Sequence, residues 1–448
     1  MLTPDQAKDI AASLVEKALK AGASAADAML MAEHSSGVSV RLGELEDVHR
    51  SEGQEIGLRV FDGSRSASVA SSDLSAEALD ALVERAAAMA REAPEDPFAG
   101  LAPEELLLRG PAPSFDAFDP EEPDPAAMRA RALAAEEAAL GVAGVTNSNG
   151  GSASASSSTV ALATSGGFAG AYRASGFSNS ASVVAGEGST MQRDYAYHSA
   201  RHLADLEAPE EIGRRAGERA AARVGPVKPE PGRYPIIFEP RVASSLLGHF
   251  SAAITGSSIA RGTSFLLGKL GERVFAPSII IRDDPHRPRG LRSRPFDGEG
   301  LPVHAIDLVS NGVLTSWMMD SAAARQLGMQ PTGHATRGIS GAPGAGPSNL
   351  SLQPGPRGRE ALLAAFPRAI LVTELIGQGV NGVTGDYSRG AAGFLVEGGE
   401  IGRPVAEITI ASNLLEMFAT LEPASDLRYR RGVDAPTVLV PEMTVAAG

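Results

Sequence analysis

The spacing of apolar residues predicts four helices in the first half of the chain. Apolar positions recur every three or four residues in the stretches 3–21, 75–93, 126–139 and 209–224. The first stretch has the clearest start, because Thr3 followed by Gln6 has the spacing of a capping box, which satisfies free amides at a helix N-terminus. We therefore expect helices that each bury one apolar face.

Shorter stretches between these helices have the character of strands. They cover residues 28–33, 37–42, 56–61 and 66–70, with a hairpin signal at Asp62-Gly63 before the last. Residues 142–200 are so rich in Ser, Gly and Ala that composition alone suggests disorder, yet apolar residues recur between the glycines. We expect hairpins there, and hence an α+β domain in which helices cover an antiparallel sheet.

The proline-rich, acidic stretch 93–125 leaves two interpretations open. It is either a linker or a long ordered loop that wraps the domain, anchored by its phenylalanines. Near its end, Glu121, Glu122 and Asp124 are expected to begin the next helix, where carboxylates favour the positive end of the helix dipole.

A proline- and glycine-rich run at 225–232 is the predicted domain boundary. A chain of 448 residues is too long for one typical core, so two domains are expected. We assign residues 1–224 to an N-terminal α+β domain, 225–232 to a linker and 233–448 to a C-terminal domain.

The C-terminal domain opens with an apolar strand, 234–238, that turns into a helix. Val242, Leu246 and His249 recur along one face of this helix. Further strands are expected at 278–281, 303–309, 313–319 and 369–375, followed by a hairpin of 394–397 and 400–401 around Gly398-Gly399. A flexible-looking loop is expected at 333–349 and a last helix at 411–420. This pattern predicts a β-rich domain with few helices.

Composition limits the partners and the chemistry. The net charge of -14 speaks against non-specific binding to nucleic acid or anionic membrane, both of which need a basic face. The chain has no cysteine, which excludes disulfides, thiolate zinc ligands and cysteine nucleophiles. No secretory signal or membrane-length apolar run is visible, so we expect a cytoplasmic protein with no membrane partner.

Three local patterns suggest chemistry, but each has a simpler explanation. His198 and His202 have the spacing of a helical metal-binding pair but lack an accompanying glutamate, which favours a solvated or structural pair. Asp283 and Asp284 precede a proline, which favours a turn over a metal or acid/base site. Residues 377–382 match GxGxxG, but the glycines that follow oppose the helix that a dinucleotide site needs.

Several runs of the C-terminal half resemble the TldD/PmbA family. They are TSFLL (263–267), PFDGEG (295–300), PTGHA (331–335), QGVNGVTGDYS (378–388) and ITIASN (408–413). The resemblance covers roughly residues 234–418, and the N-terminal half agrees mainly in layout. Members of this family, once described as modulators of DNA gyrase, pair as a two-subunit metalloprotease.

The resemblance implies a subunit without its own catalytic metal. The TldD-type subunit carries an HExxxH motif, and alignment of its second histidine with His249 places Ser244 and Ser245 at the first histidine and the glutamate. A serine hydroxyl is a poor zinc ligand and too weak a base to activate water. The pattern is that of the PmbA/TldE-type subunit, for which we expect no catalytic residue and no bound cofactor, with zinc in the partner.

By this resemblance, the chain pairs with a TldD-type zinc protease subunit and acts on unfolded peptides or in peptide-antibiotic maturation. His249 is then a remnant in the helix core or a group near the peptide path. Candidate peptide-binding residues are His249, Arg261, His334 and Asp386, and the chain alone could form a homodimer.

Two alternatives stay open. One is an autonomous metalloprotease in which His249 binds zinc together with His286, His304 or His334, although a catalytic site needs three ligands and a base. The other is a protein-binding regulator of DNA gyrase, which could contact protein rather than DNA despite the acidic charge.

Overall fold

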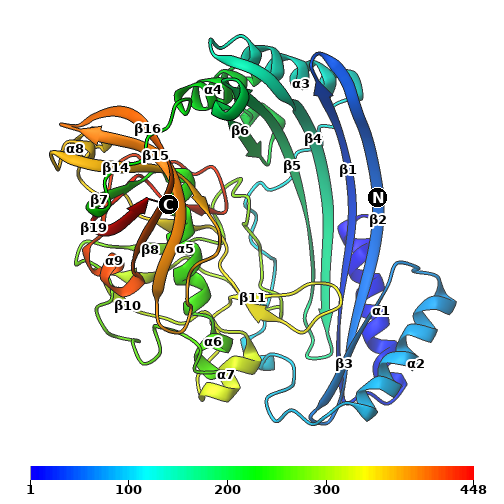
Figure 1. The fold of residues 1–448 in the computed structure, drawn as a ribbon. Coiled ribbons are helices and arrows are strands. Elements are labelled where there is room, and N and C mark those ends of the chain that lie inside the picture. The colour runs from blue at the N-terminus through cyan, green and yellow to red at the C-terminus, as the bar shows by residue number, and fades with distance from the viewer. Residues whose placement is uncertain (1, 448) are drawn as a thin grey trace.

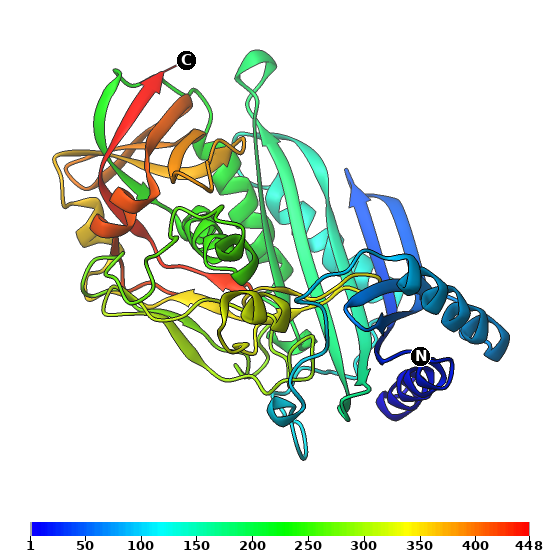
Figure 2. The same cartoon turned by 90° about the horizontal axis from the view of Figure 1, so that it is seen from below.

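The computed structural model describes residues 2–447 and has the predicted α+β architecture. A long twisted sheet with four helices forms one side of the molecule, and a β-rich body forms the other (Figures 1 and 2). The helices are α1 (Pro4–Lys20), α2 (Ala76–Glu92), α3 (Pro125–Leu140), α4 (Pro209–Ala222), α5 (Pro240–Ala253), α6 (Gly256–Ala260), α7 (Ser321–Leu327), α8 (Arg359–Leu363) and α9 (Leu414–Thr420). Short 3-10 turns lie at Glu104–Leu106, Gly188–Thr190 and Leu203–Asp205.

The N-terminal sheet has six antiparallel strands in the order β3-β2-β1-β4-β5-β6. Its strands are β1 (Ala25–Arg41), β2 (Glu44–Asp62), β3 (Arg65–Ser71), β4 (Val145–Thr164), β5 (Ala169–Ala185) and β6 (Gln192–Ala200). The predicted hairpin at Asp62-Gly63 is confirmed, since β2 and β3 pair on either side of it. The separate strands predicted at 28–33 and 37–42 are one continuous strand, because the polar residues between them still pair with β2 and β4.

Alternation of serine and alanine explains why the serine-rich stretch is ordered. On β4, Ala153 and Ala155 are buried in a cluster with Met128 and Ala132 of α3. The intervening Ser154 and Ser156 lie on the opposite, exposed face, as expected for a strand with period two. All four helices cover one face of the sheet, and the other face turns toward the C-terminal half (Figure 1).

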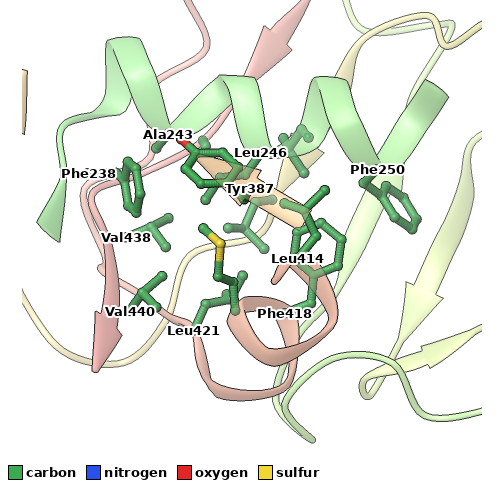
Figure 3. Packing of buried hydrophobic residues seen from close by; sticks show 14 of the residues in the cluster. Phe238, Ala243, Leu246, Phe250, Tyr387, Leu414, Phe418, Leu421, Val438 and Val440 are labelled. Atoms are coloured by element: carbon green, nitrogen blue, oxygen red, sulfur yellow. The ribbon is translucent and has the colours of Figure 1, made fainter. Parts of the chain in front are cut away.

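The C-terminal half contains a small closed barrel. Its strands are β7 (Gly232–Phe238), β14 (Arg368–Ile376), β15 (Asp386–Glu397), β16 (Glu400–Asn413), β17 (Glu422–Pro423) and β19 (Val438–Ala447). They lie in the order β16-β15-β14-β7-β19-β17, and an additional pairing of β16 with β19 closes the ring. Helix α5 packs on a large apolar cluster that includes Phe238, Phe250, Tyr387 and Phe418 (Figure 3).

A second sheet has the order β10-β9-β8-β13-β18, with a separate pair formed by β11 and β12. The strands are β8 (Ile281–Asp283), β9 (Ile306–Ser310), β10 (Val313–Leu314), β11 (Ala335–Thr336), β12 (Gly344–Ala345), β13 (Leu350–Leu352) and β18 (Val433–Asp434). The strand predicted at 278–281 lies further along as β8, which places Asp283 in a strand rather than in a turn. The loop 333–349 contains the β11–β12 pair and packs against the N-terminal sheet (Figure 1).

Ordered loops join the two halves. The stretch 93–125 is an ordered loop rather than a free linker, since Arg325 donates hydrogen bonds to the carbonyls of Phe98, Gly100 and Leu101. The boundary predicted at 225–232 stays a prediction.

No helix within residues 2–447 is both long and apolar enough to cross a bilayer.

Candidate functional site

Helix α5 begins where strand β7 ends, at Glu239 and Pro240. Pro240 occupies the first helical position, where a missing amide hydrogen costs nothing. The two serines aligned with the metal-binding motif bond to their own helix. Ser244 Oγ donates to the carbonyl of Arg241 (3.3 Å) and Ser245 Oγ to that of Val242 (2.6 Å). Their hydrogens are therefore used locally, as is common for serine within helices.

His249 lies at the edge of the apolar core. Its ring meets the ring of Tyr387 edge to face, with centroids 6.1 Å apart. Its Nε2 is buried and has no hydrogen-bond partner among residues 2–447. Burial lowers the pKa of His249, and the positive charge of Arg389 lowers it further, so both favour the neutral imidazole.

The part of the chain that the structure describes brings no three His, Cys, Asp or Glu side chains together in a way that could hold a metal ion. His334 instead contacts Asp283 (3.4 Å) and Thr332 (2.9 Å) in a buried position. His202 follows strand β6, not a helix, and contacts Asp116 (3.2 Å). The autonomous zinc site therefore lacks a ligand set among the described residues.

A pocket of about 280 Å³ opens beside the N-terminal half of α5, between β6 of the first sheet and β14 and β15 of the barrel. Its lining consists of Arg193, Asp194, Tyr195, Arg223, Arg241, Val242, Ser245, Thr373, Glu374, Leu375 and Arg389. We call it the α5 pocket. Ser245, at the position aligned with the motif's glutamate, lies in its wall.

Asp194 organises one side of the α5 pocket. Both of its carboxylate oxygens accept hydrogen bonds from Arg241 (2.6 and 2.9 Å), and one lies 3.3 Å from Arg223. Arg223 also pairs with Glu374. Burial alone would raise the pKa of Asp194, but the hydrogen bonds and charge of Arg241, the amide of Tyr195 and the charge of Arg223 together outweigh it, and the pKa lies below its usual value.

Arg389 lines the other side of the α5 pocket and, unlike Arg241 and Arg223, is not paired with a carboxylate among the described residues. The residue is only 9% exposed, yet within residues 2–447 it has no ion pair, and its Nε has no hydrogen-bond partner. Thr373, 6% exposed, also lines the pocket, and its buried hydroxyl has no hydrogen-bond partner in the described part of the chain. Polar groups this buried are normally paired, so Arg389 and Thr373 are unusual in the wall of this pocket.

The predicted peptide-binding residues do not gather in one place. Arg261 is exposed at the end of the short helix α6. Asp386 is exposed near the start of β15, where it accepts hydrogen bonds from Thr384 (2.7 Å) and Asn413 (3.2 Å). His334 is buried elsewhere, and only His249 lies near the α5 pocket. Their role in peptide binding stays a prediction.

Sequence reasoning missed Arg389 and Thr373, although the run Tyr387-Ser-Arg-Gly-Ala391 held a signal. Alternate residues of a strand share a face, and Tyr387 and Ala391 are buried in the core around α5. Arg389 shares that face and is buried with them.

Models of the PmbA/TldA metallopeptidase family match three parts of the chain. Domain 1 matches residues 26–90, the central domain residues 118–224 and the C-terminal domain residues 231–447. Metalloprotease PmbA of Escherichia coli O157:H7 is 40% identical over 91% of this chain and 89% of its own length. A PmbA homolog of Haemophilus influenzae is 37% identical over 96% of this chain and 94% of its own.

Solved structures share the fold. A candidate modulator of DNA gyrase from Bacteroides thetaiotaomicron has a TM-score of 0.92 at 26% identity, with all of both chains covered. TldE from Thermococcus kodakarensis has a TM-score of 0.85 at 22% identity over 97% of this chain and 99% of that one. At that identity the second likeness concerns the fold alone.

Proposed function

Because this chain belongs to the PmbA/TldD metallopeptidase family, we propose that it is the PmbA/TldE-type subunit of a two-subunit metalloprotease. In this proposal a TldD-type partner holds the zinc ion, and the pair acts in the cytoplasm on unfolded peptides or in peptide-antibiotic maturation. This chain contributes an interface and a surface for the peptide, not a catalytic metal.

The state of helix α5 is the observation that supports this proposal. Hydrolysis by a zinc peptidase needs three protein ligands and a base positioned beside the metal-bound water. Here the aligned positions hold Ser244 and Ser245, whose hydroxyls bond to their own helix, and His249, which packs on Tyr387. The fold is kept while the ligand set is missing, as expected for a subunit whose partner supplies the chemistry.

The remaining alternatives have less support. An autonomous zinc enzyme would need ligands that the described residues do not bring together. Regulation of DNA gyrase rests on the description of solved relatives such as the Bacteroides protein, and no residue of this chain independently favours it.

Hydrolysis of an unfolded peptide tests the proposal. The pure chain, an HExxxH-bearing paralogue from the same cell, and an equimolar mixture are each assayed with added zinc. We expect the mixture to exceed this chain alone by at least about a hundredfold, the range in which a positioned base contributes.

Two variants control this assay. Replacement of the HExxxH glutamate in the partner by glutamine should abolish the activity of the mixture. Ser244→Ala in this chain should leave it unchanged, because that hydroxyl donates its hydrogen bond to the carbonyl of Arg241 in its own helix. Metal-dependent hydrolysis by the pure chain would overturn the proposal.

A further inference from the structure

Arg389 carries a buried positive charge that the described part of the protein does not neutralise. A charge removed from water is costly unless a partner or an ion compensates it. Tyr387 and His249 lie nearby, but an imidazole carries no negative charge and burial raises the pKa of Tyr387, so neither compensates Arg389. Within residues 2–447 no carboxylate is paired with Arg389, so an anion bound in the pocket would supply the compensating charge.

The other charges around the α5 pocket are already matched. Arg241 and Arg223 both form ion pairs with Asp194, and Arg223 also forms one with Glu374. Of the remaining arginines in the wall, Arg193 is exposed to water at the rim and Arg389 is buried. A ligand in this pocket therefore meets one desolvated, unmatched guanidinium.

The geometry points to a carboxylate as that ligand: we infer that the α5 pocket binds a carboxylate group of a peptide, with Arg389 as its principal donor. A guanidinium presents parallel N–H groups that match the two oxygens of a carboxylate. Thr373, whose buried hydroxyl has no hydrogen-bond partner among the described residues, lies in the same wall. That the carboxylate belongs to a peptide rests on the proposed function.

Two features favour a carboxylate over a phosphate. Asp194 and Glu374 line the same pocket and would repel a second negative charge on the ligand. Val242 and Leu375 add apolar wall beside the charged groups, which suits the aliphatic part of an amino acid. One buried cation therefore matches one negative charge.

Binding of a matched peptide pair to the full chain alone tests this inference. Two fluorescein-labelled alanine-rich pentapeptides of identical sequence end in a free carboxylate or in an amide, and fluorescence anisotropy gives Kd for each. The free acid should bind about tenfold tighter or more, the range expected for a charge-assisted hydrogen bond. In Arg389→Met this preference should disappear.

Controls separate the pocket from general charge and from misfolding. Arg403→Met removes an exposed arginine of β16 outside the pocket and should keep the preference. Without ligand, Arg389→Met should melt no lower than the natural chain, because a buried uncompensated charge has been replaced by an apolar side chain of similar length. A lower melting temperature would mean that Arg389 is neutralised within the protein and would overturn the inference.

Competition identifies the ligand chemistry. Acetate should displace the free-acid peptide, and inorganic phosphate at the same concentration should do so more weakly. Equal affinity of the acid and amide peptides, or stronger displacement by phosphate, would contradict a carboxylate site.

This result is independent of the peptidase assay. If the chain prefers the free-acid peptide but the mixture is inactive, the carboxylate site is supported and the proposed subunit role is refuted. If the mixture is active but the chain shows no such preference, the subunit role is supported and the carboxylate site is refuted.

Discussion

Glu299 is a buried carboxyl group whose surroundings favour its neutral form. It is 5% exposed, and Ser321 donates to Oε2 from its amide (2.9 Å) and its hydroxyl (2.7 Å). Burial, with the nearby charge of Asp297, raises its pKa from 4.5 to about 7 despite these bonds. The folded protein therefore binds this proton more tightly than the unfolded chain does.

Replacement of Glu299 by glutamine should change how stability depends on pH. Because the folded-state pKa is the higher one, the natural chain loses stability as pH rises from about 4.5 to about 7. Glu299→Gln lacks this loss, so between pH 5 and pH 8 its free energy of unfolding should rise relative to that of the natural chain by about 2–3 kcal/mol. Urea unfolding at pH 5 and pH 8 measures the free energy of unfolding of both proteins. A difference between the two proteins that is the same at both pH values would refute this prediction.

For individual residues, the sequence predicts helix caps well but predicts poorly which polar side chains are buried. The capping box of Thr3 and Gln6 is confirmed, because it depends only on neighbours in the chain. Glu299 lies in a polar, glycine-rich run typical of an exposed turn, and its burial comes from Ser321 and other residues distant in sequence. Arg389 was missed as well, although the alternation of Tyr387, Arg389 and Ala391 along β15 indicates a shared face.

Strand β2 is crossed by the loop between β11 and β12. A Cβ on Gly57 would lie 1.6 Å from the carbonyl oxygen of Ile339, closer than any real contact. The loop approaches the sheet here because the strand carries no side chain at this point. Gly53, on the same strand, has nothing within 4 Å of its Cβ position.

Gly57→Ala should therefore lower the free energy of unfolding by about 1–3 kcal/mol, the usual cost of forcing extra volume into a packed site. It should also make the loop around Ile339 more susceptible to limited proteolysis. Gly53→Ala serves as the matched control and should change neither property. If both variants had the same free energy of unfolding and the same susceptibility to proteolysis, the loop around Ile339 would not pack against β2 at Gly57.

The type of most elements could be predicted from the sequence, but strand length could not. Ser-Ala alternation in β4 is a regular strand pattern that composition hides, and it became clear only through the helix that covers its alanines. The prediction that no helix follows the GxGxxG match is confirmed, because residues 377–385 contain none. Closure of the barrel by β16 and β19 pairs distant segments and has no local signal.

The two halves of the molecule are joined by a buried ionic cluster. Asp27 of β1 pairs with Arg59 of β2 (2.5 Å) and with Arg337 from the loop of the C-terminal half. All three side chains are 7% exposed or less. A single carboxylate thus holds two buried guanidinium groups, and its loss would leave both without this partner.

Asp27→Asn should lower the free energy of unfolding by about 3–5 kcal/mol, the cost of breaking a buried ion pair from one side. Asp62→Asn, at the exposed end of β2, is the control and should stay within about 0.5 kcal/mol. Urea unfolding followed by circular dichroism measures both. A loss below about 1 kcal/mol for Asp27→Asn would show that Glu299 or solvent compensates the arginines.

The whole molecule is proposed to act only together with a zinc-bearing partner, and a subunit titration tests this most directly. A fixed amount of the HExxxH paralogue is mixed with increasing amounts of this chain, and hydrolysis of an unfolded peptide is followed. Activity should rise to a plateau at one equivalent, and this chain alone should remain inactive at every zinc concentration. Zinc-dependent hydrolysis by the pure chain, or activity of the paralogue that does not change on addition of this chain, would contradict the account.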